Sequence, residues 1–69
     1  MKINGAEVTL PDDTTLLDYL EQNQYKLERI AVEYNGEILS RDQYETVVLQ
    51  SADVIEIVSF VGGGCYEYI

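Results

Sequence analysis

The sequence has few of the residues on which protein chemistry most often depends. Its 69 residues include no histidine, no tryptophan, one cysteine and one proline. A single cysteine excludes an internal disulfide bond, and also an iron–sulfur cluster or a structural zinc site held by this chain alone. Without histidine, other transition-metal sites are excluded as well. No nucleophile–base pair and no metal-ligand set is present, so we expect neither catalysis by this chain nor a resident cofactor or metal.

Positive charge is also scarce. Four Lys and Arg stand against 13 Asp and Glu, which gives a net charge of −9. Nucleic acids and anionic membranes require a basic surface, so we expect neither as a partner. The charge favours a basic protein partner, because complementary fields speed encounter, and it serves equally well to keep a small protein in solution.

Long apolar runs are missing as well. The first residues contain no apolar run of signal-peptide length, and no stretch approaches the length of a membrane span. We therefore expect a cytoplasmic location. A chain this short makes one domain with a thin core.

The first half of the sequence reads as a hairpin followed by a helix. Asn4-Gly5 is a favoured two-residue hairpin turn, which predicts paired strands within residues 1–10. Thr15 and Asp18 have the spacing of a capping box at a helix start. The helix that follows has one apolar stripe, made by Leu16, Leu17 and Leu20.

The second half returns to strand patterns. Asn35-Gly36 predicts a second hairpin, between residues 27–34 and 37–39. A single helical turn is expected near residues 40–44, a short extended piece over 46–49 and a last strand over 54–61.

This β-β-α-β-β-β order predicts an α+β fold of the β-grasp (ubiquitin-like) type. In it, one short helix packs across one face of a mixed sheet of four to five strands, with the first and last strands adjacent at the centre. We expect a domain over residues 1–61 and a flexible glycine-rich tail over 62–69.

The last strand is the candidate functional element. Glu56 is costly to bury, so its face should point to solvent, while Ile55 and Ile57 point under the helix. Val58 and Phe60 would then form an exposed apolar patch, and we predict a partner-docking surface at Val58, Phe60 and Val61. The glycines that follow this strand, Gly62, Gly63 and Gly64, are typical either of a frayed terminus or of an arm that enters a partner.

Three stretches together resemble one family. They are Ala-Val-Glu-Tyr-Asn-Gly-Glu-Ile-Leu-Ser-Arg (31–41), Ser-Ala-Asp-Val-Ile-Glu-Ile-Val (51–58) and Phe-Val-Gly-Gly-Gly (60–64). Over residues 1–64 the chain resembles the ThiS family of bacterial sulfur carriers in thiamine biosynthesis.

The resemblance implies a carrier and not an enzyme. It makes Gly64 the sulfur-bearing residue, with Gly62 and Gly63 as the stem of the arm. An ATP-using, E1-like (ThiF-like) partner would adenylate the Gly64 carboxylate, and sulfur from cysteine would replace the adenylate to give a thiocarboxylate. A ThiG-like thiazole synthase would receive the sulfur. Other acceptors (molybdopterin, a tRNA base or a metabolite), and a role as a ubiquitin-like modifier or binding module, stay open alternatives.

Residues 65–69 depart from the family pattern, because the amide bond to Cys65 leaves Gly64 without a carboxylate. One explanation is a processing junction between Gly64 and Cys65, cut by a tail-trimming zinc-dependent protease as in related carriers. The others are a changed role with a plain peptide tail, an appended foreign sequence, and acyl chemistry at Cys65, for which no activating base or basic neighbour is present. The alternating apolar pattern of Tyr66, Tyr68 and Ile69 would suit either a sheet edge or a disordered tail.

Overall fold

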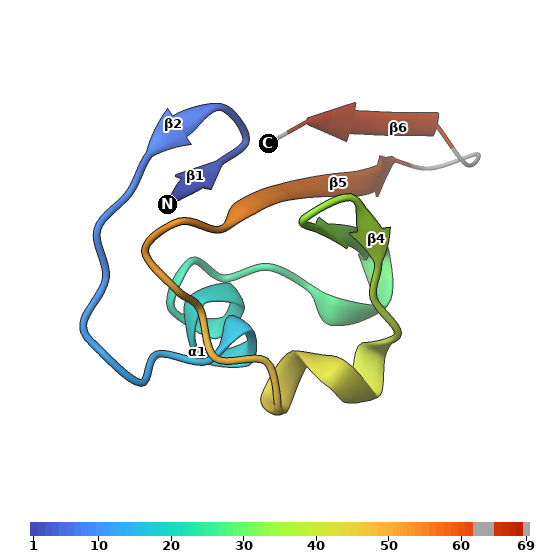
Figure 1. Cartoon of the computed structure of the whole chain (residues 1–69). Helices are drawn as coiled ribbons and strands as arrows, with labels where there is room; N and C mark the ends of the chain where they lie inside the picture. The colour runs from blue at the N-terminus through green and yellow to red at the C-terminus, as the bar shows by residue number, and fades with distance from the viewer. Residues whose placement is uncertain (62–64, 69) are drawn as a thin grey trace.

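The computed structural model describes residues 1–61 and 65–68. The elements follow the predicted order as far as the long strand near the carboxyl end, and a further strand comes after it (Figure 1). They are β1 (Lys2–Ile3), β2 (Ala6–Glu7), α1 (Leu16–Gln22), the 3₁₀ turn η1 (Leu27–Arg29), β3 (Ile30–Tyr34), β4 (Glu37–Ile38), the 3₁₀ turn η2 (Arg41–Glu45), β5 (Val54–Val61) and β6 (Cys65–Tyr68).

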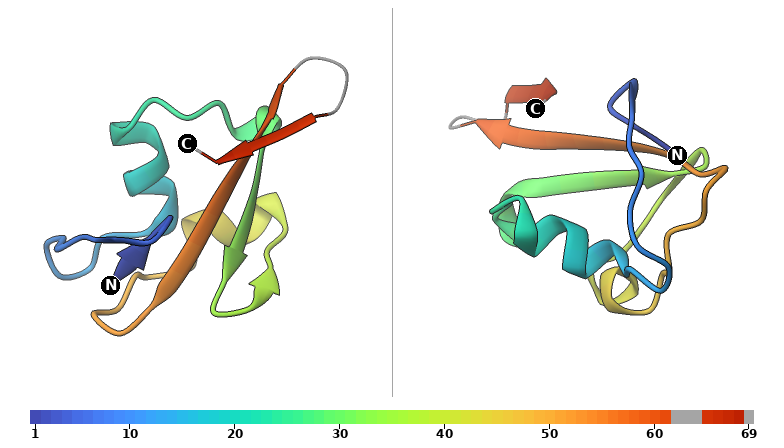
Figure 2. Two further views of the ribbon diagram at one scale, coloured as in Figure 1. Left: turned by 90° about the horizontal axis from the view of Figure 1, so that it is seen from above. Right: turned by 90° about the vertical axis from the view of Figure 1, so that its left-hand side faces the viewer.

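The strands form one mixed sheet in the order β2-β1-β5-β3-β4, and β6 pairs with β5 outside this path. β1 and β5 run parallel, and every other pair is antiparallel. The first strand thus lies beside the long strand that returns from the far end of the chain, which confirms the predicted β-grasp arrangement. The sheet lies on one side of α1, as the right-hand view of Figure 2 shows.

Both Asn-Gly pairs make the predicted hairpin turns. Asn4 and Gly5 have φ of 51° and 82°, and Asn35 and Gly36 have φ of 50° and 89°. Two successive residues with positive φ define the type I′ turn, whose twist matches that of the strands it joins.

The helix begins where the capping-box signal predicted. The Thr15 side chain accepts a hydrogen bond from the Asp18 N–H (3.1 Å), and the Asp18 carboxylate accepts one from the Thr15 N–H (3.3 Å). Its buried positions are Leu16 and Leu20, one turn apart on the face toward the sheet.

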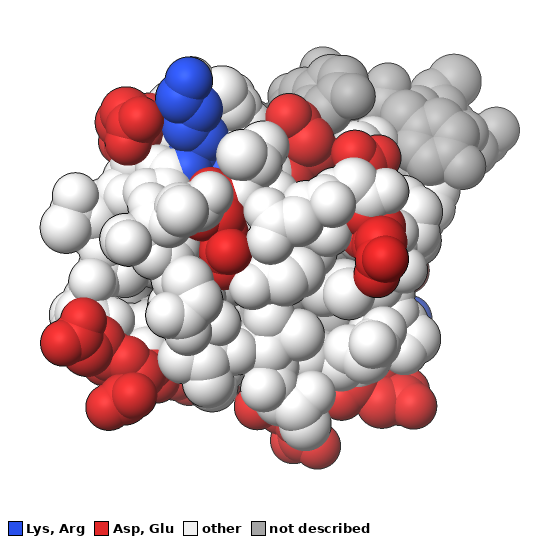
Figure 3. Space-filling model, viewed as in Figure 1, with Lys and Arg blue, Asp and Glu red and all other residues white. Residues whose placement is uncertain are grey.

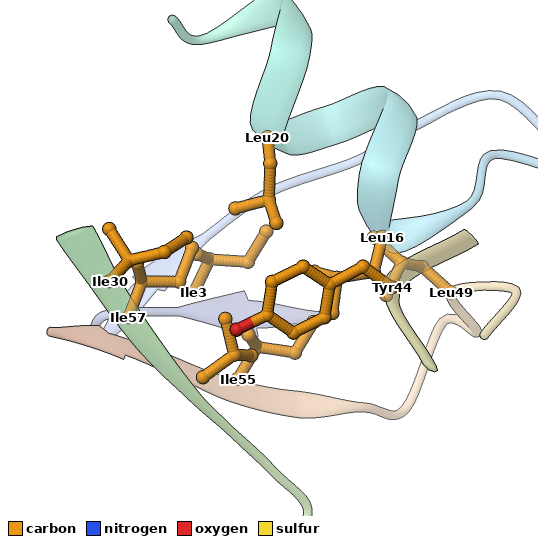
Figure 4. Packing of buried hydrophobic residues seen from close by; sticks show 9 residues of the cluster. Ile3, Leu16, Leu20, Ile30, Tyr44, Leu49, Ile55 and Ile57 are labelled. Atoms are coloured by element: carbon orange, nitrogen blue, oxygen red, sulfur yellow. The ribbon is translucent and has the colours of Figure 1, made fainter. Parts of the chain in front are cut away.

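The core is a single layer between α1 and the sheet (Figure 4). Ile55 and Ile57 of β5 are fully buried, as predicted. Tyr44 of η2 is also buried, and the sequence analysis did not place it in the core. The core residues are Ile3, Leu16, Leu20, Ile30, Val32, Tyr44, Leu49, Ile55 and Ile57.

The second half of the chain has one less regular element than the sequence predicted. The extended piece expected over 46–49 forms only an isolated bridge, in which Val48 faces Thr15. The division into a domain (1–61) and a flexible tail (62–69) stays a prediction, although β6 now lies within the tail segment. None of the helices in the described part of the chain is long and apolar enough to cross a membrane.

Candidate functional site

Within residues 1–61 and 65–68, no helix lies on one of the two faces of the sheet. Alternation along β5 places Ile55 and Ile57 under α1, so the even-numbered residues from 54 to 60 point the other way. Residues that are paired across strands share a face, which adds neighbours from β1 to β4. We call this set the uncovered face: Lys2, Glu7, Ala31, Glu33, Ile38, Val54, Glu56, Val58 and Phe60.

The uncovered face is partly apolar. Ile38 is 69% exposed and Val54 47% exposed, whereas Val58 and Phe60 are half-buried. The expected open patch at Val58 and Phe60 is therefore less exposed than the sequence suggested. The reason is that β3 and β6 flank this part of β5, with Ala31 opposite Val58 on one side.

Two acidic residues occupy directly opposed positions on this surface. Glu33 lies directly opposite Glu56 in the β3–β5 pair, and Ile38 lies opposite Glu33 in the neighbouring pair. Like charges in directly opposed positions destabilise a sheet. Acidic groups are also spread over the side of the molecule seen in Figure 3, where basic groups are few. A cationic group from a partner would relieve the repulsion at this pair.

The predicted attachment site, Gly64, comes three residues after β5 in the sequence. Val61 is the last residue of that strand, and Cys65, the first residue of β6, lies opposite it. Gly62, Gly63 and Gly64 lie outside the described residues. The residues that are described contain no group of three or more His, Cys, Asp or Glu that could hold a metal ion.

The opposite end of β5 is held by a buried carboxylate. Asp53 accepts hydrogen bonds from the Tyr34 hydroxyl (2.6 Å), the Asn35 side-chain amide (3.1 Å) and the Gln50 N–H (2.8 Å). The Asn35 side-chain oxygen accepts in turn from the Val54 N–H (2.8 Å). These bonds tie the β3–β4 turn to the start of β5.

This network shifts two pKa values. Burial alone would raise the pKa of Asp53, but its hydrogen bonds and the charge of the amino terminus leave that pKa below the ordinary 3.8. Burial raises the pKa of Tyr34 to about 12, and both the hydrogen bond to Asp53 and the negative charge of Asp53 contribute to this rise. Tyr34 therefore remains a neutral donor, and Asp53 an ionised acceptor, over the physiological range.

Two relations between distant strands were not predicted from the sequence. One is the opposed pair Glu33 and Glu56, although both occupy alternate polar positions in predicted strands. The other is the role of the Asn4 side chain, whose oxygen accepts a 2.7 Å hydrogen bond from the Ile57 N–H. Neither relation has a local signal, because each depends on the register between distant strands.

Known proteins resemble this chain along nearly its whole length. The sequence model described as the ThiS family matches residues 1–64. The sulfur carrier protein ThiS of Bacillus subtilis is 43% identical over 65 residues, which are 93% of this chain and 98% of that protein. A thiazole synthase of Magnetococcus marinus is 42% identical over 62 residues, which are 90% of this chain and 19% of that protein.

The fold has a solved counterpart. The crystal structure of a thiamine biosynthesis protein (ThiS) from Geobacter metallireducens superposes with a TM-score of 0.72 and 27% sequence identity. It covers 91% of this chain, and this chain covers 96% of it. Together with the pairing of β1 with β5 and the helix-covered core, these matches show that the chain belongs to the ThiS family, the non-catalytic sulfur carriers of thiamine biosynthesis.

Proposed function

We propose that the chain carries sulfur as a thiocarboxylate on Gly64 after residues 65–69 are removed. The observation that carries this proposal is the match between the ThiS family and residues 1–64, which ends at Gly64 while the chain continues. Gly64 is then the position at which the family places its reactive carboxyl group. The carrier would act in the cytoplasm.

The chemistry requires a free carboxyl group. Water must first hydrolyse the amide between Gly64 and Cys65, which leaves a carboxylate on Gly64 and an amine on Cys65. A carboxylate oxygen then attacks the α-phosphorus of ATP and pyrophosphate leaves. The acyl adenylate has a good leaving group, so hydrosulfide (HS⁻) can attack the acyl carbon and displace AMP, and loss of the remaining sulfur-bound proton to solvent gives the thiocarboxylate.

Glycines suit this task for a steric reason. The carbonyl of Gly64 must enter an active site on a partner, and Gly62 and Gly63 must follow it. A side chain on any of the three would widen the arm at the point where it is threaded, and glycine has no Cβ. Close, aligned placement of the reacting atoms then lowers the barrier to transfer.

Three kinds of partner follow from this scheme. A ThiF-like enzyme would adenylate Gly64, and a ThiG-like thiazole synthase would accept the sulfur. The second is supported by thiazole synthases of Magnetococcus marinus and Paramagnetospirillum magneticum, each of which contains a segment similar to 90% of this chain. A carrier-like segment in the same polypeptide as the synthase suits direct delivery between the two. A protease that cuts after Gly64 is the third partner.

We propose that such partners dock on the uncovered face. Exposed Ile38 and Val54 offer apolar area there, and Glu33 opposite Glu56 offers paired negative charge. Val58, Phe60 and Val61 connect this surface to the glycines that must reach the partner's active site. A partner surface with an apolar centre and a Lys or Arg side chain would complement it.

The deciding measurement is the intact mass of the protein isolated from its native cells. A mass that ends at Gly64, with one oxygen replaced by sulfur, would establish the trimmed carrier. A mass that ends at Ile69 in all of the protein would overturn the proposal.

A reconstituted assay checks the order of steps. The full chain and a chain ending at Gly64 are incubated with a ThiF-like enzyme and ATP, and pyrophosphate release is measured. Only the shorter chain should release pyrophosphate. Equal release from both chains would show that the Gly64 carboxylate is not the group that reacts.

A further inference from the structure

β5 has two different partners along a single edge. β1 pairs with it only at Val54 and Ile55, and β6 pairs with it from Val58 to Val61 (Figure 1). The Ile57 N–H lies between the two segments and donates to the Asn4 side-chain oxygen. The edge beyond Ile57 would therefore lack a partner strand if β6 were not there.

The printed hydrogen bonds show which main-chain groups face this edge. The Asn4 N–H donates to the Ile55 carbonyl (2.9 Å), so Ile55 and Ile57 both turn their main-chain polar groups toward β1. On the other side, the Asn35 N–H donates to the Val54 carbonyl (2.8 Å). Because these groups alternate along a strand, Ser59 and Val61 also face the β1 side.

β6 supplies partners for those groups. Ser59 lies opposite Glu67, and Val61 lies opposite Cys65. Since Ser59 and Val61 face this edge, these are the hydrogen-bonded pairs of the ladder, in which opposed residues exchange both N–H···O bonds. An uncovered strand edge is a template for pairing with another chain, and proteins commonly cover such edges.

We propose that Cys65–Tyr68 is an intramolecular edge strand that closes β5 to strand addition as long as the chain is uncut. The strand that covers this edge is thus part of the same chain, and it protects the main-chain N–H and C=O groups of Ser59 and Val61. This role goes beyond sulfur carriage and does not depend on it.

The pairing also restricts how far the chain can reach past β5. Residues of a hydrogen-bonded pair such as Val61 and Cys65 have Cα atoms about 5.5 Å apart. Four residue steps of extended chain would separate the same two atoms by about 14 Å. Paired β6 and an arm extended into a partner therefore exclude each other, and the uncut chain is held in a closed form.

Amide hydrogen exchange, measured by NMR on the full-length protein, tests the edge strand. The informative variant is Glu67→Pro, because proline removes the N–H that would pair with Ser59 and cannot donate to a ladder. The matched control is Glu67→Thr, which also removes the charge but keeps the N–H and favours a strand. The internal references are Glu56 and Val58, whose N–H groups face β3.

In the natural protein and in Glu67→Thr, the Ser59 and Val61 amides should be protected. In Glu67→Pro, the Ser59 and Val61 amides should exchange roughly tenfold faster or more, because β6 separates from β5 more often. The exchange of Glu56 and Val58 should be unchanged, because the pairing of β5 with β3 is not affected. Equal exchange of Ser59 and Val61 in all three proteins would overturn the proposal. That result would leave the mass and pyrophosphate measurements untouched, so the two proposals fail separately.

Discussion

The Tyr34 hydroxyl and the Asp53 carboxylate, nineteen residues apart in sequence, are joined by a 2.6 Å hydrogen bond. Asp53 is buried, and its other acceptor positions are filled by Asn35 and Gln50. Polar groups removed from water need such partners, since each one left unpaired costs free energy. The network aligns the start of β5, and therefore supports the strand that leads to the glycines.

Tyr34→Phe should lower the free energy of unfolding by about 1.5–3 kcal/mol, the range for a hydrogen bond to a charged group. Urea denaturation followed by circular dichroism measures the change. Tyr25→Phe is the matched control, because Tyr25 is also half-buried and its hydroxyl donates no hydrogen bond to the described residues, whereas its main-chain bond to Leu20 is unaffected by the change. Equal losses in the two variants would show that ring packing, and not the bond to Asp53, matters at Tyr34.

The stability should fall in acid because of Asp53. Its folded-state pKa lies below the ordinary 3.8, so its contribution is complete above pH 3.8 and is lost as the pH falls through the lower folded-state value. Asp53→Asn should be less stable at neutral pH, and its stability should fall less steeply over this acid range. Parallel acid curves for the two proteins would contradict the assignment.

Tyr34 produces the opposite dependence in alkali. Its pKa is raised from 10.0 to about 12, so the stabilisation is complete below pH 10 and is lost as the pH rises from 10 toward 12. Thermal denaturation across that range should show a decline in the natural protein that is smaller in Tyr34→Phe. The difference in tyrosinate absorbance between the natural protein and Tyr34→Phe isolates the titration of Tyr34 from that of the other five tyrosines. A Tyr34 that ionises near pH 10 in the folded protein would refute the prediction.

Docking on the uncovered face predicts a contrast between two exposed apolar residues. Ile38→Glu should weaken binding to a ThiF-like enzyme roughly tenfold or more, which is about 1.4 kcal/mol, because it adds charge beside Glu33 and removes apolar contact. Val48→Glu is the control, since Val48 is 37% exposed but faces Thr15, away from this surface. Calorimetric titration measures the affinity of each variant for the enzyme. Equal affinities of the two variants would show that Ile38 does not contribute to the interface.

The same surface predicts a charge effect. Glu56→Gln should slow association with a basic partner and reduce the dependence of the association rate on salt, because electrostatic attraction acts mainly on encounter. It should also stabilise the free protein slightly, since it ends the repulsion between Glu33 and Glu56. Stopped-flow kinetics at two salt concentrations, with urea denaturation of the free protein, checks both statements.

Core packing gives the simplest prediction. Ile57→Ala should cost about 2–5 kcal/mol, because Ile57 is fully buried and the vacated space cannot close completely. Ile38→Ala, at a side chain that is 69% exposed, should change stability by no more than about 0.5 kcal/mol. Urea denaturation of both variants makes the comparison, and similar losses would contradict the burial of Ile57.

Features encoded by neighbouring residues could be predicted from the sequence. The type I′ turns at Asn4-Gly5 and Asn35-Gly36, the capping box at Thr15, and the inward side of β5 all rest on local conformational preference or on the two-residue period of a strand. The β-grasp order followed from those pieces. The motifs that ended at Gly64 identified the family, because they are short and contiguous.

Relations between distant residues came from the folded chain alone. The facing of Glu33 and Glu56, the bond from Ile57 to Asn4, and the pairing of β6 with the edge of β5 depend on how strands are brought together. Strand register is a property of the whole sheet, and no single segment contains the information to set it. Local pattern thus specified the elements and the family, while the assembled sheet specified which residues share the uncovered face and which strands lie along the edge of β5.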